Sequence, residues 1–177
     1  MTLSLQEFRS AFRRHASTVA VVSYFDEEER PCGMTVSSAV SLSSEPPSLL
    51  VSLHRRARTF ELVEKQGAFG VNLLHLDQRA IAQHCSRPGA DKLLRPEWIA
   101  DEAGSRTPVV SGAMAHLDCT LERWHPEFTH ALLIGVIEKA ILGDPEASPL
   151  MYFGGGYNRV ASEVDEVDRQ HWQLQIG

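Results

Sequence analysis

A succession of short apolar runs rich in β-branched residues, separated by polar or proline-containing turns, most constrains what this 177-residue chain can fold into. Runs of this length are typical of antiparallel strands rather than of long helices. About seven such strands and three short helices predict a mainly β domain, a barrel or sandwich with helical additions. The clearest expected strands cover residues 19–25, 34–42, 48–53, 69–74, 115–122 and 132–142.

Two of these runs should be buried to different extents. Over 115–122, apolar residues alternate with polar ones, which predicts a strand with one wet face that carries His116 and Asp118. The run 132–142 is longer and apolar almost throughout, so we expect it to be more fully buried.

The first expected helix starts at Ser4-Leu5-Gln6-Glu7, which has the spacing of a capping box. Apolar residues then recur at intervals of three and four, so one face of this helix is apolar. We expect that face to lie on a sheet through Leu5, Phe8 and Phe12.

Two further helices are expected in the middle of the chain. Thr59 has the side chain of a helix N-cap, and the helix should run to Lys65 and stop at Gly67. Asp77 can begin a third helix, which should end near Cys85.

The longest stretch without clear periodicity covers residues 86–111 and is rich in Pro, Gly and charge. It is either an ordered loop over a site or a mobile segment. No linker divides the chain into two cores, so we expect a single domain over 1–160, followed by an acidic tail over 161–177.

Acidic residues outnumber basic ones, 23 to 17, for a formal net charge of −6. No global basic field is then present to hold nucleic acid or an anionic membrane surface, and any anion site must be local. The chain shows neither the apolar region of a signal peptide nor a run of about 18 apolar residues, so we expect a cytoplasmic protein without a membrane partner. Reduced thiols are expected at the widely spaced Cys32, Cys85 and Cys119.

Six hydroxyl side chains interrupt the otherwise apolar segment 33–44, which Glu45-Pro46-Pro47 follows. Hydroxyls and the backbone groups beside them both donate and accept hydrogen bonds, which suits the edge of a flavin ring, where carbonyl and imide groups alternate. The same residues fit an exposed edge strand whose Ser and Thr side chains merely face water.

The densest basic cluster precedes the helix that Thr59 should cap, and it comprises His54, Arg55, Arg56 and Arg58. A helix dipole disfavours cations at its N-terminus unless an anion binds there, so the cluster predicts a phosphate site. Arginines with their stems packed on the surface would also make an ordinary solvated face. A second phosphate contact, or none, is offered by the loop residues Ser86, Arg87 and Lys92.

His130 stands at the start of the long apolar run, with no acid, Ser or Cys at the spacing of a hydrolytic triad or a metal site. A single His of this kind is either structural or catalytic. Period two puts His116 and Cys119 on opposite strand faces, which argues against a metal site that would also use His125. Tyr157, after three glycines, either stacks on a bound ring or closes the core.

In order along the chain, these segments resemble the flavin reductase-like family of FMN-binding split barrels, the small reductase components of two-component flavin monooxygenases. The likeness covers Phe8 to about Val160. Its elements are F-R-R-H-A-S-T-V-A-V-V-S, the hydroxyl segment with its Pro-Pro, L-L-V-S-L-H-R-R-A-R-T-F, F-G-V-N-L-L, D-K at 91–92 and G-G-Y. The resemblance implies a mainly β fold, a split β-barrel of Greek-key type with a few short helices.

The resemblance also implies site residues. The isoalloxazine ring would be lined by Thr35, Val36, Ser37 and Ser38. The ribityl chain and phosphate would be approached by Ser52, His54, Arg58 and Thr59, and Ser86 and Lys92 would come from the loop over the phosphate side. The remaining cofactor contacts would come from Met34, Leu53 and Tyr157.

The family often has a Gly-Asp-His triplet before the long strand, with its His near flavin and nicotinamide. The corresponding residues here are Phe128, Thr129 and His130, so the His is kept while Gly and Asp are not. The resemblance therefore implies that His130 is catalytic. Hydride transfer is still expected without the Gly and Asp, because the protein need only stack two rings and stabilise charge.

The function implied by the resemblance is that of an NAD(P)H:flavin oxidoreductase, which reduces FMN or FAD and supplies the reduced flavin to a partner monooxygenase. A homodimer with flavin near the subunit interface is also implied. The choices between FMN and FAD and between NADH and NADPH stay open. Two other interpretations are a flavoprotein with tightly bound FMN that acts directly on a small organic substrate, and a flavin-binding protein without turnover.

Overall fold

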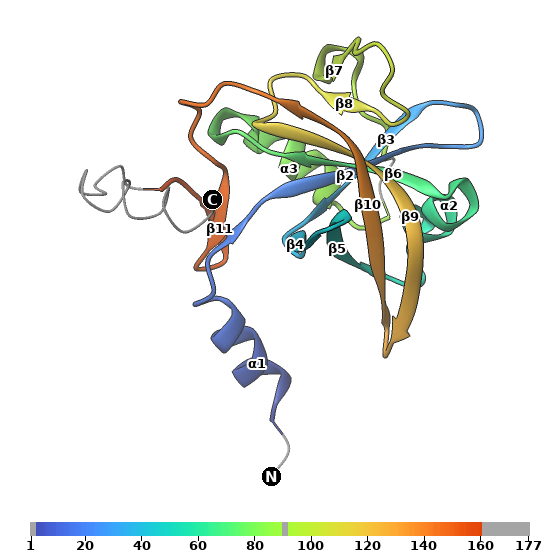
Figure 1. Cartoon of the computed structure of the whole chain (residues 1–177). Coiled ribbons are helices and arrows are strands. Elements are labelled where there is room, and N and C mark those ends of the chain that lie inside the picture. Colours follow the sequence, from blue (N-terminus) through green and yellow to red (C-terminus); the bar gives the residue numbers. More distant parts are fainter. Residues whose placement is uncertain (1–2, 90–91, 161–177) are drawn as a thin grey trace.

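The structure is a computed structural model that describes residues 3–89 and 92–160 (Figure 1). The expected acidic tail, 161–177, lies outside the described residues, and so does Asp91. Within the two described ranges, no helix is both long and apolar enough to cross a membrane. In chain order the elements are α1 (Leu5–Phe12), β1 (Ser17–Thr18), β2 (Ala20–Phe25), β3 (Pro31–Val36), β4 (Val40–Ser44), β5 (Pro47–His54), α2 (Arg58–Gln66), β6 (Ala68–Leu73), η1 (Leu76–Gln78), α3 (Arg79–Ser86), η2 (Pro96–Trp98), β7 (Ile99–Ala100), β8 (Val109–Val110), β9 (Ala115–Glu127), β10 (His130–Leu142), β11 (Met151–Phe153) and β12 (Gly156–Asn158).

Seven antiparallel strands form the main sheet in the order β3-β2-β6-β9-β10-β5-β4. The strands β3 and β4 lie at opposite ends of this order, although only residues 37–39 separate them in the chain. The two ends must therefore come together, and the sheet curls into an open barrel (Figure 1). Together with the solved structures reported below, this arrangement confirms the mainly β, split-barrel fold. The expectation of one strand over 34–42 is wrong, because the chain crosses between the sheet edges at 37–39.

Ser38 lies in this crossing and ties it to β5. Its hydroxyl donates to the carbonyl oxygen of Ser52 and accepts from the Ser52 backbone N–H, both at 3.1 Å. One side chain thus satisfies a donor and an acceptor of the neighbouring strand, as the backbone of a longer β3 would have done.

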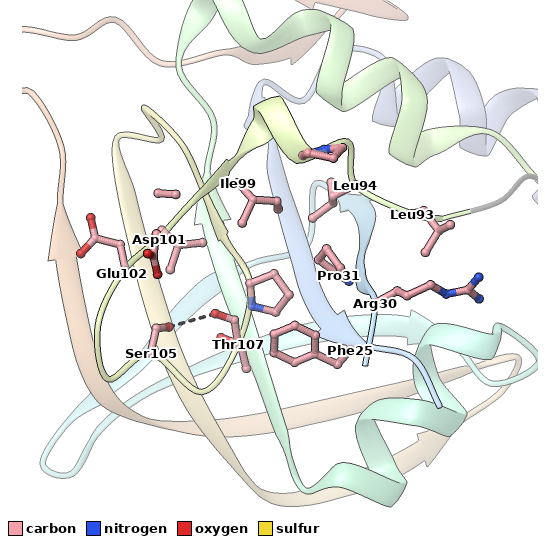
Figure 2. Close-up of a pocket in the computed structure, with 14 residues that line it drawn as sticks. Phe25, Arg30, Pro31, Leu93, Leu94, Ile99, Asp101, Glu102, Ser105 and Thr107 are labelled. Atoms are coloured by element: carbon pink, nitrogen blue, oxygen red, sulfur yellow. Dashed lines mark hydrogen bonds between the residues drawn. The ribbon is translucent and has the colours of Figure 1, made fainter. Parts of the chain in front are cut away.

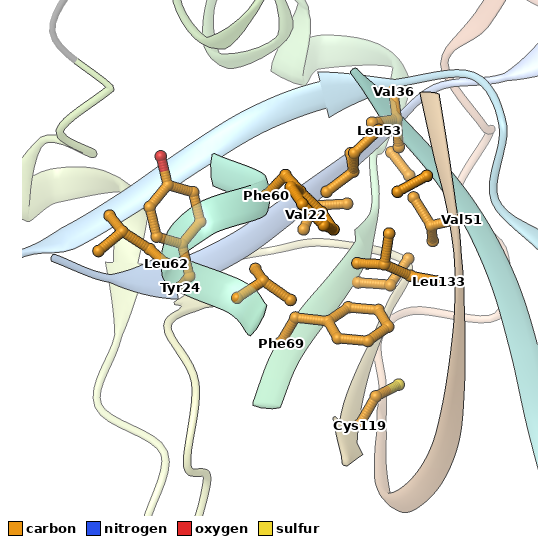
Figure 3. Packing of buried hydrophobic residues seen from close by; sticks show 14 of the residues in the cluster. Val22, Tyr24, Val36, Val51, Leu53, Phe60, Leu62, Phe69, Cys119 and Leu133 are labelled. Atoms are coloured by element: carbon orange, nitrogen blue, oxygen red, sulfur yellow. The ribbon is translucent and has the colours of Figure 1, made fainter. Parts of the chain in front are cut away.

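The barrel interior is filled by the side chains shown in Figure 3, among them Val22, Phe69 and Leu133, which are fully buried. A second buried cluster lies on the other face of β2, where Val19 and Val21 pack against α3. Because β2 is buried on both faces, its sequence is apolar except for Ser23, whose hydroxyl donates to the carbonyl oxygen of Pro108 at 2.6 Å.

A strap of residues 92–111, containing η2, β7 and β8, covers the outer face of β9. The expected wet face of this strand is therefore wrong: His116 and Asp118 are each 1% exposed. Thr107 of the strap donates its hydroxyl to Asp118 Oδ1 at 2.6 Å, and the Arg106 N–H donates to Asp118 Oδ2 at 2.7 Å. The sequence leaves residues 86–111 as either an ordered loop or a mobile segment. The described part of this segment has the hydrogen bonds of an ordered loop.

Asn72 completes this buried network from β6. Its Oδ1 accepts from the Val110 N–H at 2.8 Å, so the Nδ1 of His116, 2.9 Å away, must carry a proton and donate to the same oxygen. The Nε2 of His116 then faces the hydroxyl of Thr107 at 3.3 Å. Burial lowers the pKa of His116, and the nearby Asp118 opposes that shift.

Helix α1 has the capping box that the sequence predicts, with the Ser4 hydroxyl accepting from the Glu7 N–H at 3.2 Å. Its expected place on a sheet is wrong, because the helix stands away from the barrel (Figure 1) and buries none of its residues. Phe8 and Phe12 stack on each other and stay 47% and 61% exposed. The three-and-four spacing of apolar residues predicted the helix correctly, but it did not predict that the apolar face of the helix is left uncovered by the described chain.

Strand β10 begins at His130, and only its first half is buried. The expectation that 132–142 is the more fully buried strand is wrong, since its second half has no buried residue and Leu142 at its far end is 78% exposed. The expected helix near 77–85 is confirmed as η1 followed by α3.

Helix α2 stops at Gly67, which is left-handed with φ 66°, as predicted. It starts differently, because the N-cap is Ala57 and Thr59 lies inside the helix, so Thr59 is not the cap. Thr59 is buried, with 2% of its surface exposed, and its hydroxyl donates to the hydroxyl of Tyr24 at 3.0 Å. Burial raises the pKa of Tyr24 to about 12, and this hydrogen bond opposes the rise.

We predict that His116→Gln weakens the pH dependence of folding stability. The unfolded chain takes up a proton on this His near pH 6.5, whereas burial holds the folded pKa lower. His116 therefore stabilises the fold fully above that pH, and this contribution falls as the pH drops from 7 to 5. Urea unfolding at pH 5, 6 and 7 gives the free energy of unfolding at each pH, and this free energy should change less with pH in the variant. The variant is also less stable at pH 7 by about 1–2 kcal/mol. If the free energy of unfolding changed with pH equally in both proteins, His116 would not be the group responsible.

We predict that Thr59→Val lowers the free energy of unfolding by about 1–2 kcal/mol, because the buried Tyr24 hydroxyl loses its partner. Thr59→Ser keeps the hydroxyl and serves as the matched control, with a smaller loss from the missing methyl group. Chemical denaturation of the three proteins checks this, and a Val variant as stable as the Ser variant would contradict it.

Candidate flavin and nucleotide site

The site residues expected from the sequence fall into three neighbouring regions of the barrel. The first is a cavity of about 470 Å³ between β3, α3 and β12, here called the α3 cavity. Five predicted residues line it, namely Thr35, Val36, Ser37, Ser86 and Tyr157. Hydroxyl groups, an aromatic ring and glycine backbone thus meet in one hollow, which suits a flat, polar-edged ring.

The hydroxyls of this region are not equally available. Thr35 donates its hydroxyl to the carbonyl oxygen of Ala82 at 2.7 Å, and Ser38 is engaged with Ser52. The hydroxyl of Ser37, by contrast, makes no hydrogen bond within the described part of the chain, and the residue is exposed. Ser37 and the backbone groups around it are therefore the donors and acceptors left for a ring edge.

Tyr157 is half-buried at the far wall of the α3 cavity, with its ring 5.7 Å from that of Tyr152. Burial raises the pKa of its phenol, and a hydrogen bond with Ser86 opposes that shift. It packs partly on the outer core and also lines the cavity, where stacking on a bound ring stays a prediction.

Sequence reasoning missed Arg79 and Gln83, which line the same cavity. They lie seven and three residues before Ser86, so helical period puts all three on one face of α3, a signal that could have found them. The Arg79 guanidinium lies 5.8 Å from the centre of the Tyr157 ring.

The second region, here the α2 cavity, has a volume of about 420 Å³ and lies at the N-terminus of α2. Arg56, Arg58, Thr59 and Lys92 line it, so the basic cluster and the long loop meet as expected. Ala57 offers no side chain to cap the first N–H groups of α2. Cations and uncapped N–H groups together favour a phosphate here.

Two of these cations already have protein partners. Arg58 forms an ion pair with Glu27. Lys92 donates its Nζ to the carbonyl oxygens of Cys85 and Arg87, at 2.8 and 2.6 Å, so it closes the C-terminal end of α3. Burial lowers its pKa. Arg56, which sequence reasoning placed in the cluster without a role, lines the cavity without an ion pair among the described residues.

The third region is the end of β5 and β10, where His54 and His130 are register partners. Their rings lie edge to face with centres 5.2 Å apart. The Nδ1 of His54 accepts from the Arg56 N–H at 3.1 Å, and the Nδ1 of His130 lies 2.9 Å from the Thr129 hydroxyl. Both rings are thus held in position at an exposed edge.

Two of the predicted site residues, Met34 and Leu53, have side chains that pack in the barrel core rather than in a cavity. The side chain of Leu53 is 1% exposed and belongs to the barrel core, and Met34 packs against the same core. Any contact of Leu53 with a ligand would come from its backbone.

A third cavity, of about 690 Å³, contains none of the predicted residues. Figure 2 shows Phe25 and Pro31 on its apolar walls together with Leu94 of the strap, with Asp101 and Glu102 toward one end. The described residues contain no group of three or more His, Cys, Asp or Glu that could hold a metal ion.

Comparisons with known proteins agree with this geometry. Residues 12–161 match the model of the flavin reductase like domain. The reductase component of 4-hydroxyphenylacetate 3-monooxygenase from Thermus thermophilus is 39% identical over 157 residues, which cover 88% of this chain and 96% of that protein. NADH:riboflavin 5'-phosphate oxidoreductase from Streptomyces pristinaespiralis is 32% identical over 148 residues, which cover 84% of each chain.

Among solved structures, the flavin reductase of styrene monooxygenase from Pseudomonas putida superposes with a TM-score of 0.79 at 32% identity. The superposition covers 89% of this chain and 99% of that one. The family match over residues 12–161 spans the barrel, α3 and the strap rather than one motif. The chain belongs to the flavin reductase-like family.

Proposed function

We propose that this protein is an NADH-dependent flavin reductase that supplies reduced flavin to a partner monooxygenase. The observation that carries the proposal is that a hydroxyl-bearing ring cavity and a cationic cavity lie toward the two ends of β3, the first at Thr35 and Val36 and the second at Cys32. The named activities of the relatives above, an NADH:riboflavin 5'-phosphate oxidoreductase among them, support the same reaction.

The residues present fit a flavin. Ser37 and the neighbouring backbone offer hydrogen bonds to the ring edge, and Val36 offers an apolar surface for its face. Arg56, with Lys92 and the uncapped start of α2, would hold the phosphate. Bound flavin supplies an acceptor for hydride from NADH, a chemistry that no side chain of the chain provides.

The protein's part is then to position two rings and to stabilise charge. His130 is the residue we propose for the second task. The Thr129 hydroxyl holds its Nδ1, which leaves Nε2 as the nitrogen without a partner in the described part of the chain. Nε2 can hold or give up a proton beside a reacting ring, and the neighbouring His54 limits how far the imidazole can swing.

A homodimer is part of the proposal. Exposed apolar residues gather on α1 and on the edge strand β4, where Val40 and Leu42 are 55% and 48% exposed. Such surfaces are usually covered by another chain. Sedimentation velocity should give twice the mass of one chain. We further place the protein in the cytoplasm, where NADH and the oxygenase would be available.

The assay that tests the function is oxidation of NADH and of NADPH, followed at the nicotinamide absorbance, with FMN, FAD or no added flavin. Turnover that requires added flavin is expected, with NADH as the better donor. Absence of turnover with every pair would overturn the proposal.

We predict that His130→Ala lowers kcat by about 10- to 100-fold while the flavin dissociation constant changes by less than about 3-fold. The reason is that this imidazole acts on the reacting rings, whereas the phosphate cations hold the flavin. Steady-state kinetics and flavin titration measure the two effects separately. His125→Ala, an exposed His on the same hairpin, is the matched control. Equal kcat in His130→Ala and the control would contradict the role.

A further inference from the structure

The two-residue turn between β9 and β10 has an unusual first residue. Glu127 and His130 are register partners, so Phe128 and Thr129 make the turn. Phe128 has φ 51°, while Thr129 is not among the residues with positive φ. Glycine is the residue that this position favours, because a Cβ atom crowds the backbone there and a bulky side chain is a true outlier.

Nothing within the described part of its own chain compensates Phe128 for this conformation. The residue is 96% exposed, the highest value among the exposed large apolar residues. The hairpin that carries it projects beyond the rest of the barrel (Figure 1). An apolar side chain that is both strained and exposed points to a contact made with another molecule.

The surroundings of Phe128 indicate the chemistry of that molecule. Phe128 lines a hollow of about 680 Å³ together with His54, Arg55, Arg56 and Trp124. Neither arginine has an ion pair with a described carboxylate, and the one acid in the hollow, Glu64, already accepts from the Trp124 ring N–H at 3.0 Å. Exposed aromatic surface beside unpaired guanidinium groups suits an aromatic base that carries phosphates.

We propose that Phe128 binds the hydride donor by stacking on one of its aromatic bases, with Arg55, which lines this hollow and not the α2 cavity, facing its phosphates. The hollow adjoins the pair of His54 and His130, so a dinucleotide held there has one base within the reach of the proposed catalytic His. This inference rests on the proposed function and assigns a specificity-determining residue to it.

The test is the KM for NADH of Phe128→Gly, with FMN as the flavin so that only the donor carries an adenine. The variant should raise this KM by about 10-fold, because stacking is lost, and should change kcat little. It should also raise Tm by about 1–3 °C, because glycine relieves the strained φ. Phe128→Tyr keeps the ring and should keep the KM. Reduced nicotinamide mononucleotide as donor separates the two bases: a retained effect assigns the nicotinamide, and a lost effect the adenine.

Glu29 provides a matched control, because it is the other non-glycine residue of the described chain with a positive φ, 59°. It lies in the turn between β2 and β3, away from the hollow. Glu29→Gly should raise Tm in the same way and leave the KM for NADH unchanged.

Normal turnover with an unchanged KM in Phe128→Gly would overturn the inference while leaving the proposed function intact. A lower Tm, or a shift from dimer to monomer in sedimentation, would also overturn it, since Phe128 would then be held by its own chain or by a second copy. Failure of the wild-type protein to oxidise NADH would instead count against the proposed function.

Discussion

The short crossing from β3 to β4 is the constraint on which the rest of the structure depends. Three residues cannot span an open seven-stranded sheet, so the two edge strands must lie near each other. Curling the sheet in this way encloses one apolar face and leaves Ser38 to tie the crossing to Ser52. The same crossing brings Ser37 to the outer surface, with its hydroxyl unused by the described chain. The feature that closes the barrel therefore also builds the edge at which a ring can bind.

Much of the fold could be predicted from local patterns. The capping box at Ser4, the glycine stop at Gly67 and the apolar run of β2 each depend on residues a few positions apart, so the sequence shows them directly. Failures came where burial depends on distant segments. Alternation correctly placed His116 and Asp118 on one face of β9, but only the strap, through Thr107, decides that this face is dry. In the same way, amphipathic period predicts α1 but cannot say whether its own chain covers it.

The site was predictable in part, and mainly by resemblance. The hydroxyl segment and the basic cluster do line neighbouring cavities, yet their chemistry is divided differently from the expectation. The hydroxyl of Thr59 donates to Tyr24 of β2 rather than to a ligand. Arg58 pairs with Glu27, so Arg56 is the arginine of the basic cluster that is left to bind an anion at the α2 cavity. Arg79 could have been found from the helical period of α3. The strained φ of Phe128 could not, because backbone angles at a turn depend on the register of two strands.

The order of strands in the sheet has a consequence for how the chain is made. Strand β5 lies between β4 and β10, and Val51 is a register partner of Leu133. During synthesis β4 leaves the ribosome just before β5, whereas β10 follows only after α2, β6, α3, the strap and β9. Until then one edge of β5 and the apolar residues of its inner face have no neighbour. The nascent chain thus carries an unpaired, partly apolar strand edge until β10 has been made, and this edge is open to aggregation during that interval.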